Sequence, residues 1–299
     1  MQRRIDVHVP PQWDGRPIRW VAKGPLRIST RVLNQLKRAD EGILVDGERQ
    51  FVSYILHTGQ VLSLLWEEDA VSSVEPVPGP VDIVYEDEDI LVVDKPPRMA
   101  VHPSAGNHGT TLANHLAAYY QDKGEIFVPR IITRLDKNTS GLVLLARHGL
   151  SAGILGEDIQ TGVIQKQYTA IVCGKLPQVE GVIDLPIRRK EGSVLLREVC
   201  SPDDPAGKPA RTRYAVTKYN AAQNLSLVQV WPLTGRTHQI RVHMAAMGCP
   251  LLGDFLYGTE EPERIPRHAL HMSQLTLMHP ITKENLQFTS PLPSDMNLI

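Results

Sequence analysis

Short runs of apolar or alternating residues, separated by polar turns, recur along the chain beyond its first third. Such runs are too short for helices and rich in Val, Ile and Leu, so they predict strands. The predicted strands cover residues 90–94, 141–146, 167–172, 213–219 and 225–231. A short polar link joins the last two, which predicts an antiparallel pair, and residues 275–288 are predicted to form a closing hairpin around Pro280.

Helical periodicity is confined to three segments. Residues 29–38 begin with the capping residue Ser29 and carry apolar side chains at positions that share one helix face. Further helices are predicted over residues 110–121 and, from a Thr-Gly start, over residues 235–247. After the first helix, an Asp-Gly pair and a later apolar run predict a hairpin.

The order of these elements favours an α+β fold, because strands and helices do not alternate regularly. We expect a mixed, mainly antiparallel sheet. A Pro-rich stretch at residues 74–80 is typical of a stiff linker. The sequence therefore predicts a small N-terminal α/β module with its linker at residues 1–80, and a larger domain at residues 81–299.

Composition indicates an ordinary globular protein. The 299 residues are 42% hydrophobic and 22% charged, which allows full-sized cores. No apolar stretch approaches the roughly 20 residues of a membrane-spanning helix, and no secretory signal is recognisable, so a cytoplasmic location is expected. Cys173, Cys200 and Cys249 are odd in number and far apart, which fits neither a disulfide framework nor a paired zinc site.

Charge is unevenly distributed along the chain. The net charge is −1, so the whole molecule lacks the basic excess that is typical of nucleic-acid-binding proteins. Residues 130–250, however, hold 16 Lys and Arg against 9 Asp and Glu. This local excess suits contacts with phosphate groups.

Residues 134–142 (Arg-Leu-Asp-Lys-Asn-Thr-Ser-Gly-Leu) place an acid between two cations, just before a predicted strand. A polar loop on a rigid scaffold is typical of a functional site. The neighbouring Arg134 would favour the ionised form of Asp136, as a nucleophile or base requires. The same pattern is typical of an Asp paired with its neighbours in a tight turn, so this segment alone leaves both interpretations open.

A second polar cluster follows a predicted strand. Residues 232–243 bring Arg236, His238, Arg241 and His243 together at a predicted helix start, which suits phosphate or carboxylate binding. The two histidines suggest metal ligands, but no cysteine pair or Glu stands at ligand spacing, so no metal is predicted. A charge cluster on a helix surface is the simpler alternative.

Together these two segments resemble the signature motifs of the RluA-type pseudouridine synthases, which isomerise uridine in RNA. Several motifs in one order are more specific than any short pattern. The resemblance covers about residues 81–293 and implies a pseudouridine synthase catalytic domain there. Shorter similarities follow in the family's order: Val101-His102-Pro103, Lys166 to Ala170 with Gly174, Gly207 to Thr212, Gly253-Asp254 with Tyr257-Gly258, and Leu270-His271.

The resemblance implies a role for each matching residue. It makes Asp136 the catalytic aspartate, Tyr168 the aromatic residue that stacks on the flipped uracil, and Arg236 the partner of the Asp136 carboxylate. Taken alone, Tyr168 would be interpreted as a core residue of a strand. Contacts with the substrate are expected for a further set, which comprises Arg134, Leu270, Lys166, His238, Arg241 and His102.

One position departs from the family's pattern. Thr133 stands where the family frequently has a histidine or asparagine, which affects a supporting contact but not Asp136 itself.

Residues 1–80 resemble, more loosely, a small RNA-binding module named after a ribosomal small-subunit protein. They hold 10 Lys and Arg against 10 Asp and Glu, so an RNA-binding face there depends on four cations: Arg27, Arg31, Lys37 and Arg38.

The predicted function is isomerisation of specific uridines in structured RNA by a monomeric enzyme, with ribosomal RNA favoured over transfer RNA. No cofactor is expected, because the reaction breaks and remakes a bond between sugar and base without redox chemistry. The target uridine must leave its stack at a cost of about a few kcal/mol, which phosphate contacts offset. Asp136 could attack the sugar, add to the ring or remove the 2′ proton, and the sequence does not separate these routes.

Two other functions are compatible with parts of the sequence. A haloacid-dehalogenase-type hydrolase also has an Asp followed three residues later by Thr. It needs a second acid where this chain has Asn138, and a parallel sheet with Mg²⁺. A non-catalytic RNA-binding or folding factor could use the same scaffold, and the presence of Asp136, Tyr168 and Arg236 argues against it.

Overall fold

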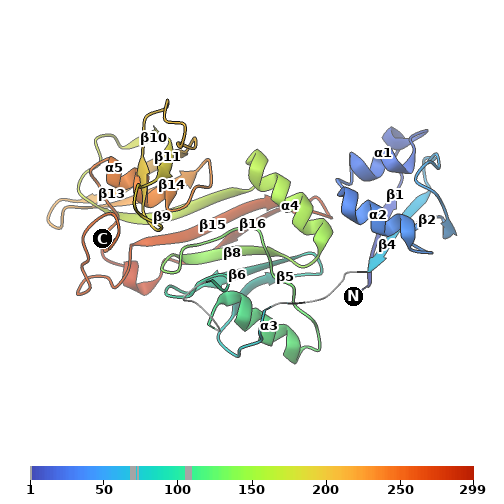
Figure 1. The fold of residues 1–299 in the computed structure, drawn as a ribbon, viewed down its shortest axis with the longest axis horizontal. Coiled ribbons are helices and arrows are strands. Elements are labelled where there is room, and N and C mark those ends of the chain that lie inside the picture. Colours follow the sequence, from blue (N-terminus) through green and yellow to red (C-terminus); the bar gives the residue numbers. More distant parts are fainter. Residues whose placement is uncertain (1, 68–71, 73, 105–109) are drawn as a thin grey trace.

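A small sheet and a large sheet divide the molecule, as Figure 1 shows. The computed structural model describes residues 2–67, 72, 74–104 and 110–299. In Figure 1 the small sheet lies at one end of an elongated molecule, and the C-terminus lies toward the other end. Each sheet packs on a hydrophobic cluster of its own.

The small sheet is formed by the first part of the chain. Its strands are ordered β1-β4-β2-β3 and pair antiparallel. Their bounds are β1 Gln2–His8, β2 Ile43–Val45, β3 Glu48–Arg49 and β4 Val61–Glu67. The helices beside the sheet are η1 Pro11–Trp13, α1 Ile18–Lys23 and α2 Thr30–Arg38.

Local sequence accounts for α2 and for the turn after it. The side chain of Ser29 accepts a hydrogen bond from the N–H of Val32 at 3.3 Å, which satisfies one free amide at the helix start. Asp46 and Gly47 join β2 to β3 with positive φ angles of 51° and 86°, as a tight hairpin turn requires. The apolar positions of α2 are buried in the small core: Val32, Leu33 and Leu36.

The large sheet contains ten strands in the described chain. Their order is β10-β13-β14-β9-β15-β8-β6-β5, with β16 paired to β15 and β7 paired to β8. Only β8 and β15 pair parallel, so the predicted α+β fold with a mixed, mainly antiparallel sheet is confirmed. The bounds are β5 Asp82–Glu86, β6 Ile90–Lys95, β7 Arg130–Ile131, β8 Ser140–Ala146, β9 Gln165–Cys173, β10 Glu180–Asp184, β13 Arg211–Asn220, β14 Leu225–Pro232, β15 Leu270–Met278 and β16 Asn285–Thr289.

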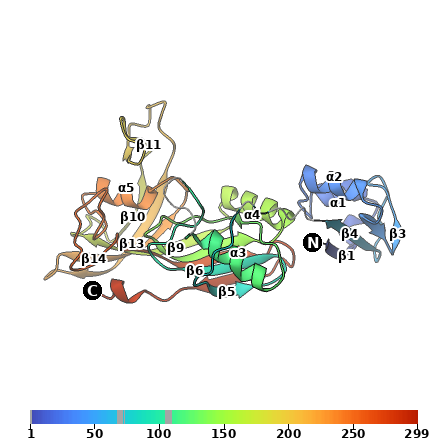
Figure 2. The same cartoon turned by 60° about the horizontal axis from the view of Figure 1, so that its bottom comes forward.

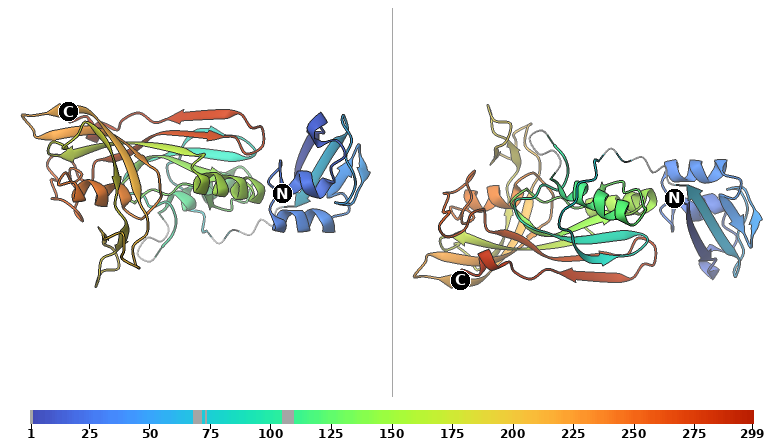
Figure 3. Two further views of the ribbon diagram at one scale, coloured as in Figure 1. Left: turned by 90° about the horizontal axis from the view of Figure 1, so that it is seen from above. Right: turned by 90° about the horizontal axis from the view of Figure 1, so that it is seen from below.

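Three helices lie on one face of the large sheet, as Figures 2 and 3 show. They are α3 Leu112–Asp122, α4 Gly149–Thr161 and α5 Gln239–Ala246, and a 3-10 turn, η2 Ser294–Met296, lies near the C-terminus. On the same side, a hairpin of β11 Ile187–Arg189 and β12 Arg197–Val199 projects from the sheet. None of the helices in the described chain is long and apolar enough to cross a membrane.

The Pro-rich segment predicted as a linker lies along α3. The Asn114 side chain donates to Glu75 O at 2.8 Å, and the Val77 N–H donates to Asn114 O at 3.1 Å. The ring of His115 contacts Val77 O at 2.9 Å. The segment is therefore held against the helix, and the domain boundary after residue 80 stays a prediction.

Arg27 joins the N-terminal part of the chain to α4. Its guanidinium donates to Glu157 at 2.7 Å, to Asp158 at 2.7 Å and to Ile154 O at 3.2 Å. Leu150 and Ile154 of α4 also belong to the hydrophobic cluster under the small sheet. Arg27 is thus bound to two carboxylates. It is not available for the RNA-binding face that the sequence analysis predicted for the N-terminal module.

The predicted strands and the helices predicted over residues 29–38 and 110–121 are present, whereas three other helices differ from expectation. The last helix begins at Gln239 rather than residue 235, because His238 has a left-handed backbone (φ 57°, ψ 18°) that does not continue a helix. Helices α1 and α4 were not predicted. Helix α4 has His148 as its N-cap residue and contains Gly153 and Gly156, which lower its helical propensity.

Gly141 lies at the start of β8, and we predict that replacing it by any residue with a side chain destabilises the protein. Its φ is 108°, and an added Cβ would lie 2.3 Å from the carbonyl oxygen of Met272. We expect Gly141→Ala to lower the free energy of unfolding by about 3 kcal/mol. Gly153→Ala is the control, because nothing lies within 4 Å of its added Cβ, and it is expected to raise stability by up to about 1 kcal/mol. Denaturant unfolding of both variants measures the difference, and equal stabilities would contradict the prediction.

Candidate active site

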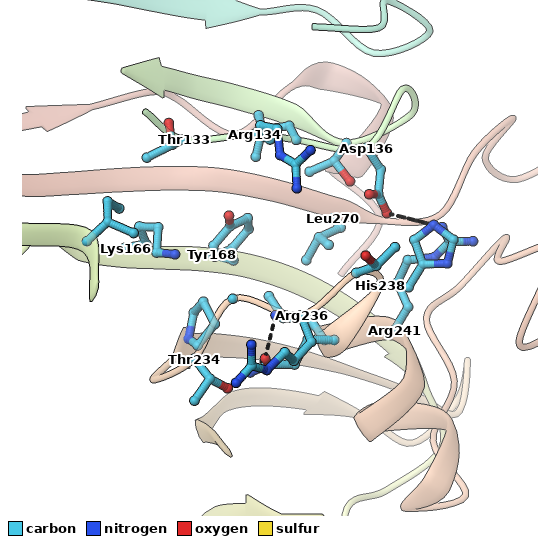
Figure 4. A pocket seen from close by; sticks show the side chains of 18 of the residues that line it. Thr133, Arg134, Asp136, Lys166, Tyr168, Thr234, Arg236, His238, Arg241 and Leu270 are labelled. Carbon is cyan, nitrogen blue, oxygen red and sulfur yellow. Dashed lines mark hydrogen bonds and ion pairs between the residues drawn. The ribbon is translucent and has the colours of Figure 1, made fainter. Parts of the chain in front are cut away.

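A cavity of about 460 Å³ lies at the centre of the large sheet, bounded by β9, β15, the loop before β8 and the start of α5 (Figure 4). This volume is within the range of small-molecule sites. Eight of the nine residues predicted for the site line it, namely Asp136, Tyr168, Arg236, Arg134, Leu270, Lys166, His238 and Arg241. The ninth, His102, is exposed and does not line the cavity, and its ring lies 3.0 Å from Pro103 O.

Lys95, at the end of β6, supports the loop that carries Asp136. Its side chain is fully buried, and its ammonium group donates to the carbonyl oxygens of Pro96 at 2.8 Å, Met99 at 2.9 Å and Lys137 at 3.3 Å. Burial lowers the pKa of Lys95 to about 7, while the nearby carboxylate of Asp136 opposes this shift. Lys95 thereby ties β6 to the loop.

Arg267 supports the same loop from the C-terminal part of the chain. Its buried guanidinium forms a two-pronged pair with Asp295 at 2.7 and 2.9 Å. Its remaining nitrogen, Nη1, donates to Asn138 O at 3.1 Å and to Leu270 O at 3.0 Å. One side chain therefore joins the Asp136 loop, the start of β15 and η2.

Two threonines fix the ends of the Asp136 loop. Thr133 Oγ1 accepts a hydrogen bond from the Leu144 N–H at 2.8 Å, so the residue at which the sequence departs from the RluA-type pattern joins the loop to β8. Thr139 Oγ1 lies 2.8 Å from Nε2 of His268. Burial lowers the pKa of His268 to about 3, so its ring is neutral at physiological pH.

Arg241, on α5, is the group that binds Asp136. Its Nη1 lies 3.2 Å from Oδ2 of Asp136, while Nε and Nη2 bind Asp254 at 2.8 and 2.7 Å. The Arg241 side chain is only 3% exposed and that of Asp254 is fully buried. Burial alone would raise the pKa of Asp254, but the hydrogen bonds from Arg241 hold it below its usual value. The three side chains form a chain of alternating charge.

The predicted pairing of Arg236 with Asp136 is wrong. Nε of Arg236 donates to Pro209 O at 3.0 Å, and the side chain is exposed at the edge of the cavity. The Arg236 N–H donates to Oε1 of Gln239 at 3.0 Å, which fixes the loop before α5. The left-handed residue between this loop and the helix redirects the chain, so Arg241 faces the carboxylate.

The two oxygens of Asp136 have different surroundings. Oδ2 faces Nη1 of Arg241 at 3.2 Å and Nε2 of His238 at 3.8 Å. Among the described residues, none donates a hydrogen bond to Oδ1, and the Asp136 side chain is 31% exposed. One oxygen is therefore held in place and the other is open toward the cavity.

Apolar and aromatic side chains form another wall of the cavity. Tyr168 on β9 and Leu270 on β15 lie on neighbouring strands and are buried. Burial, and after it the charge of Asp136, raises the pKa of Tyr168, so the phenol stays protonated. Lys166 stands two residues earlier on the same strand face, and burial lowers its pKa.

One group in the described part of the chain has the spacing of metal ligands, and it lies outside the cavity. It consists of Asp87, Asp89 and His279. These atoms are already engaged, because His279 Nε2 lies 3.0 Å from Asp87 and His148 Nε2 lies 2.6 Å from Asp89. The group therefore joins the β5–β6 turn to the β15–β16 turn and to the start of α4.

Comparison with known proteins assigns this architecture to a family. Residues 89–246 match the family model for RNA pseudouridylate synthase. A Bacillus subtilis (strain 168) protein, described as an uncharacterized RNA pseudouridine synthase, is 40% identical over 277 residues, which are 92% of this chain and 95% of the relative. The chain belongs to the RNA pseudouridylate synthase family.

Further similar proteins and solved structures support the same family assignment. Ribosomal large subunit pseudouridine synthase D of Pasteurella multocida (strain Pm70) is 38% identical over 253 residues, which are 80% of this chain and 76% of that protein. The solved structure of human RNA pseudouridylate synthase domain containing 1 is 28% identical, with a TM-score of 0.59 over 72% of this chain and 85% of that chain. The solved structure of human RNA pseudouridylate synthase domain containing 4 is 26% identical. It also has a TM-score of 0.59, and the match covers 72% of this chain and 90% of that chain.

Membership of the RNA pseudouridylate synthase family confirms two predictions. The resemblance to RluA-type enzymes is confirmed, and so is the enzyme class, an isomerase that converts uridine in RNA to pseudouridine. The roles of individual residues stay predictions. Four buried polar residues that organise the site were not assigned any role: Lys95, Gln239, Asp254 and Arg267.

Asp254 is expected to be essential for the orientation of Arg241. We predict that Asp254→Asn lowers the free energy of unfolding by about 3 kcal/mol, because a buried guanidinium loses its main counter-charge, and that it slows pseudouridine formation. Glu261→Gln is the control, since it weakens an exposed pair with Arg264 and should cost less than about 1 kcal/mol. Denaturant unfolding and initial rates measure both effects. Equal losses in the two variants would contradict the assigned importance of the buried pair.

Proposed function

We propose that this enzyme isomerises specific uridines of ribosomal RNA and that Asp136 is its catalytic carboxylate. One observation carries the proposal: of the described residues that line the cavity, Asp136 is the only one with a carboxylate. Nη1 of Arg241 binds its Oδ2 from one side, at 3.2 Å. The open Oδ1 is then free to act on the nucleotide.

The walls of the cavity suit a uracil that has left its base stack. Tyr168 supplies an aromatic ring and Leu270 an apolar surface, and both are buried against the sheet. Arg134 and Arg236 are exposed at the edge of the cavity, where phosphate groups of the RNA would pass. We infer that Tyr168 stacks on the base, that Leu270 contacts it, and that the two arginines, with Lys166, contact the backbone.

Three chemical routes use the same arrangement. The Oδ1 atom of Asp136 could attack the anomeric carbon of the sugar, add to the ring or remove the 2′ proton. Each route starts from the ionised carboxylate, and each requires that water stay out while the base turns. Arg241 contributes by holding Oδ2, so that the reacting oxygen keeps one position.

Ribosomal RNA is the substrate that we favour. The support comes from relatives described as ribosomal large subunit pseudouridine synthase D, among them the proteins of Pasteurella multocida and Vibrio parahaemolyticus. The N-terminal module adds a second surface that could contact a large folded RNA. A monomeric state and a cytoplasmic location stay predictions.

The test of this function maps pseudouridine in total RNA from a strain that lacks the gene, after incubation with the purified protein and EDTA. We expect one or a few new sites in ribosomal RNA, and we expect Asp136→Asn to produce none, with a loss of at least about a thousandfold in rate. Asp122→Asn is the matched control, because this exposed residue at the end of α3 lies outside the cavity. Chemical adducts followed by primer extension locate the sites.

Each outcome of this experiment has a clear meaning. Sites that depend on Asp136 support the proposal, and their location identifies the RNA. New sites in transfer RNA alone would contradict the ribosomal assignment. Modification by Asp136→Asn at the wild-type rate would exclude the carboxylate, and no site with the wild-type protein would favour a non-catalytic RNA binder.

The N-terminal module is expected to add affinity through α2. Arg31, Lys37 and Arg38 are exposed on this helix, unlike the bound Arg27. We predict that changing the three to Gln raises the KM for a ribosomal RNA fragment about tenfold and leaves kcat unchanged, because only phosphate contacts are lost.

A control for this prediction removes the same charge elsewhere. It changes three exposed arginines that pair with acids to Gln, namely Arg4, Arg49 and Arg264. Steady-state kinetics at two salt concentrations compare the triple variants. An equal rise in KM for both would show that net charge, and not the α2 face, determines affinity.

A further inference from the structure

His238 has a strained backbone beside the Asp136 carboxylate. Its φ of 57° and ψ of 18° place it in the left-handed region, which is unfavourable for a residue with a side chain. The ring nevertheless has a defined place, with Nε2 3.8 Å from Oδ2 of Asp136 (Figure 4). Strain that persists at a reaction centre indicates that surrounding contacts hold the residue.

The contact that holds the ring is the hydroxyl group of Tyr257. Its oxygen lies 2.8 Å from Nδ1 of His238, and the two rings meet edge to face with centroids 5.7 Å apart. Tyr257 is itself fixed, because its N–H donates to Oδ1 of Asp254 at 3.2 Å and its ring lies under the guanidinium of Arg241 at 5.1 Å. Arg241, which binds Asp136, therefore also packs on Tyr257, and Asp254 binds both Arg241 and Tyr257.

The other contact of the Tyr257 hydroxyl leaves its proton free to be donated to His238. The Arg197 N–H, on β12, donates to the Tyr257 oxygen at 3.0 Å. Burial raises the pKa of Tyr257, so its hydroxyl keeps its proton and can donate it to Nδ1 of His238. When the hydroxyl donates, Nδ1 is the acceptor, and a neutral ring carries its proton on Nε2.

The charge on the other side of the ring requires the same assignment. In the opposite tautomer, the lone pair of Nε2 would face the negative Oδ2 of Asp136, which is repulsive. With the proton on Nε2, the N–H dipole points at the carboxylate. Burial lowers the pKa of His238, although the Asp136 charge opposes this shift, so the ring remains neutral.

We propose that Tyr257 is a positioning residue that holds neutral His238 as the tautomer with its proton on Nε2, directed at Asp136. The proposal rests on the proposed role of Asp136. The separation of 3.8 Å is longer than a hydrogen bond, so His238 acts on the carboxylate through its N–H dipole. Together with Arg241, it draws Oδ2 to one side and leaves Oδ1 for the substrate.

The position of Tyr257 also links the site to the projecting hairpin. Arg197 belongs to β12 of the hairpin, and its backbone reaches Asp136 through only Tyr257 and His238. An RNA that contacts the hairpin would therefore act on a segment that is two side chains from the carboxylate. Loss of the Tyr257 hydroxyl would break this connection without removing any charged group.

The test measures the tautomer directly, in the full-length protein without RNA. Two-dimensional NMR can correlate the ring protons of a histidine with both of its ring nitrogens, and the nitrogen shifts distinguish a protonated nitrogen from an unprotonated one. The signal of His238 is assigned by its loss in His238→Gln. We expect a protonated Nε2 and a bare Nδ1 in the wild-type protein, and a mixture of tautomers in Tyr257→Phe. We also expect Tyr257→Phe to lower kcat about five- to tenfold with little change in KM.

The control is Tyr219→Phe, which removes a hydroxyl that binds Asn224 at 3.0 Å on the exposed β13–β14 hairpin. It should keep both the His238 signal and kcat of the wild-type protein. A protonated Nδ1 in the wild-type protein, or a Tyr257→Phe variant with wild-type kcat, would overturn the proposal. Because the NMR measurement needs no turnover, it decides the tautomer even if Asp136 proves not to be catalytic.

Discussion

A guanidinium that is almost completely removed from water determines the arrangement of this site. Arg241 cannot be buried alone, since an unpaired charge in the protein interior is very unfavourable. It is neutralised by Asp254 on one side and by Asp136 on the other. Because these acids lie on separate loops, both loops must converge on α5, and the cavity forms where they meet. The carboxylate proposed for catalysis is therefore also part of the structure's charge balance.

Much of the fold could be predicted from the sequence, because strands of a half-buried sheet produce apolar runs of characteristic length. Strands β6, β8, β9, β13 and β14 were all expected from such runs. Helix α4 was not, because glycines at 153 and 156 lower its helical propensity and its packing against β7 and β8 compensates for them. Tertiary contacts of this kind leave no local pattern.

The site was predictable to the extent that its residues occur in continuous motifs. The loop with Asp136 and the segment before α5 were both found, but the choice between Arg236 and Arg241 was wrong. That choice depends on the left-handed backbone of His238, which neither propensity nor spacing indicates. Lys95 and Arg267 were missed for another reason: both bind carbonyl oxygens of the loop, and any residue type provides such an oxygen.

The bond from Arg267 to the Asp136 loop has a consequence for how the enzyme matures during translation. Arg267 is synthesised 129 residues after Asn138, whose carbonyl oxygen it binds, and its partner Asp295 is synthesised later still. Strand β15, which pairs with β8 directly after the loop, is also made late. A nascent chain on the ribosome can form the small sheet early, whereas the site around Asp136 acquires its final geometry only once the segment from β15 to Asp295 has left the exit tunnel.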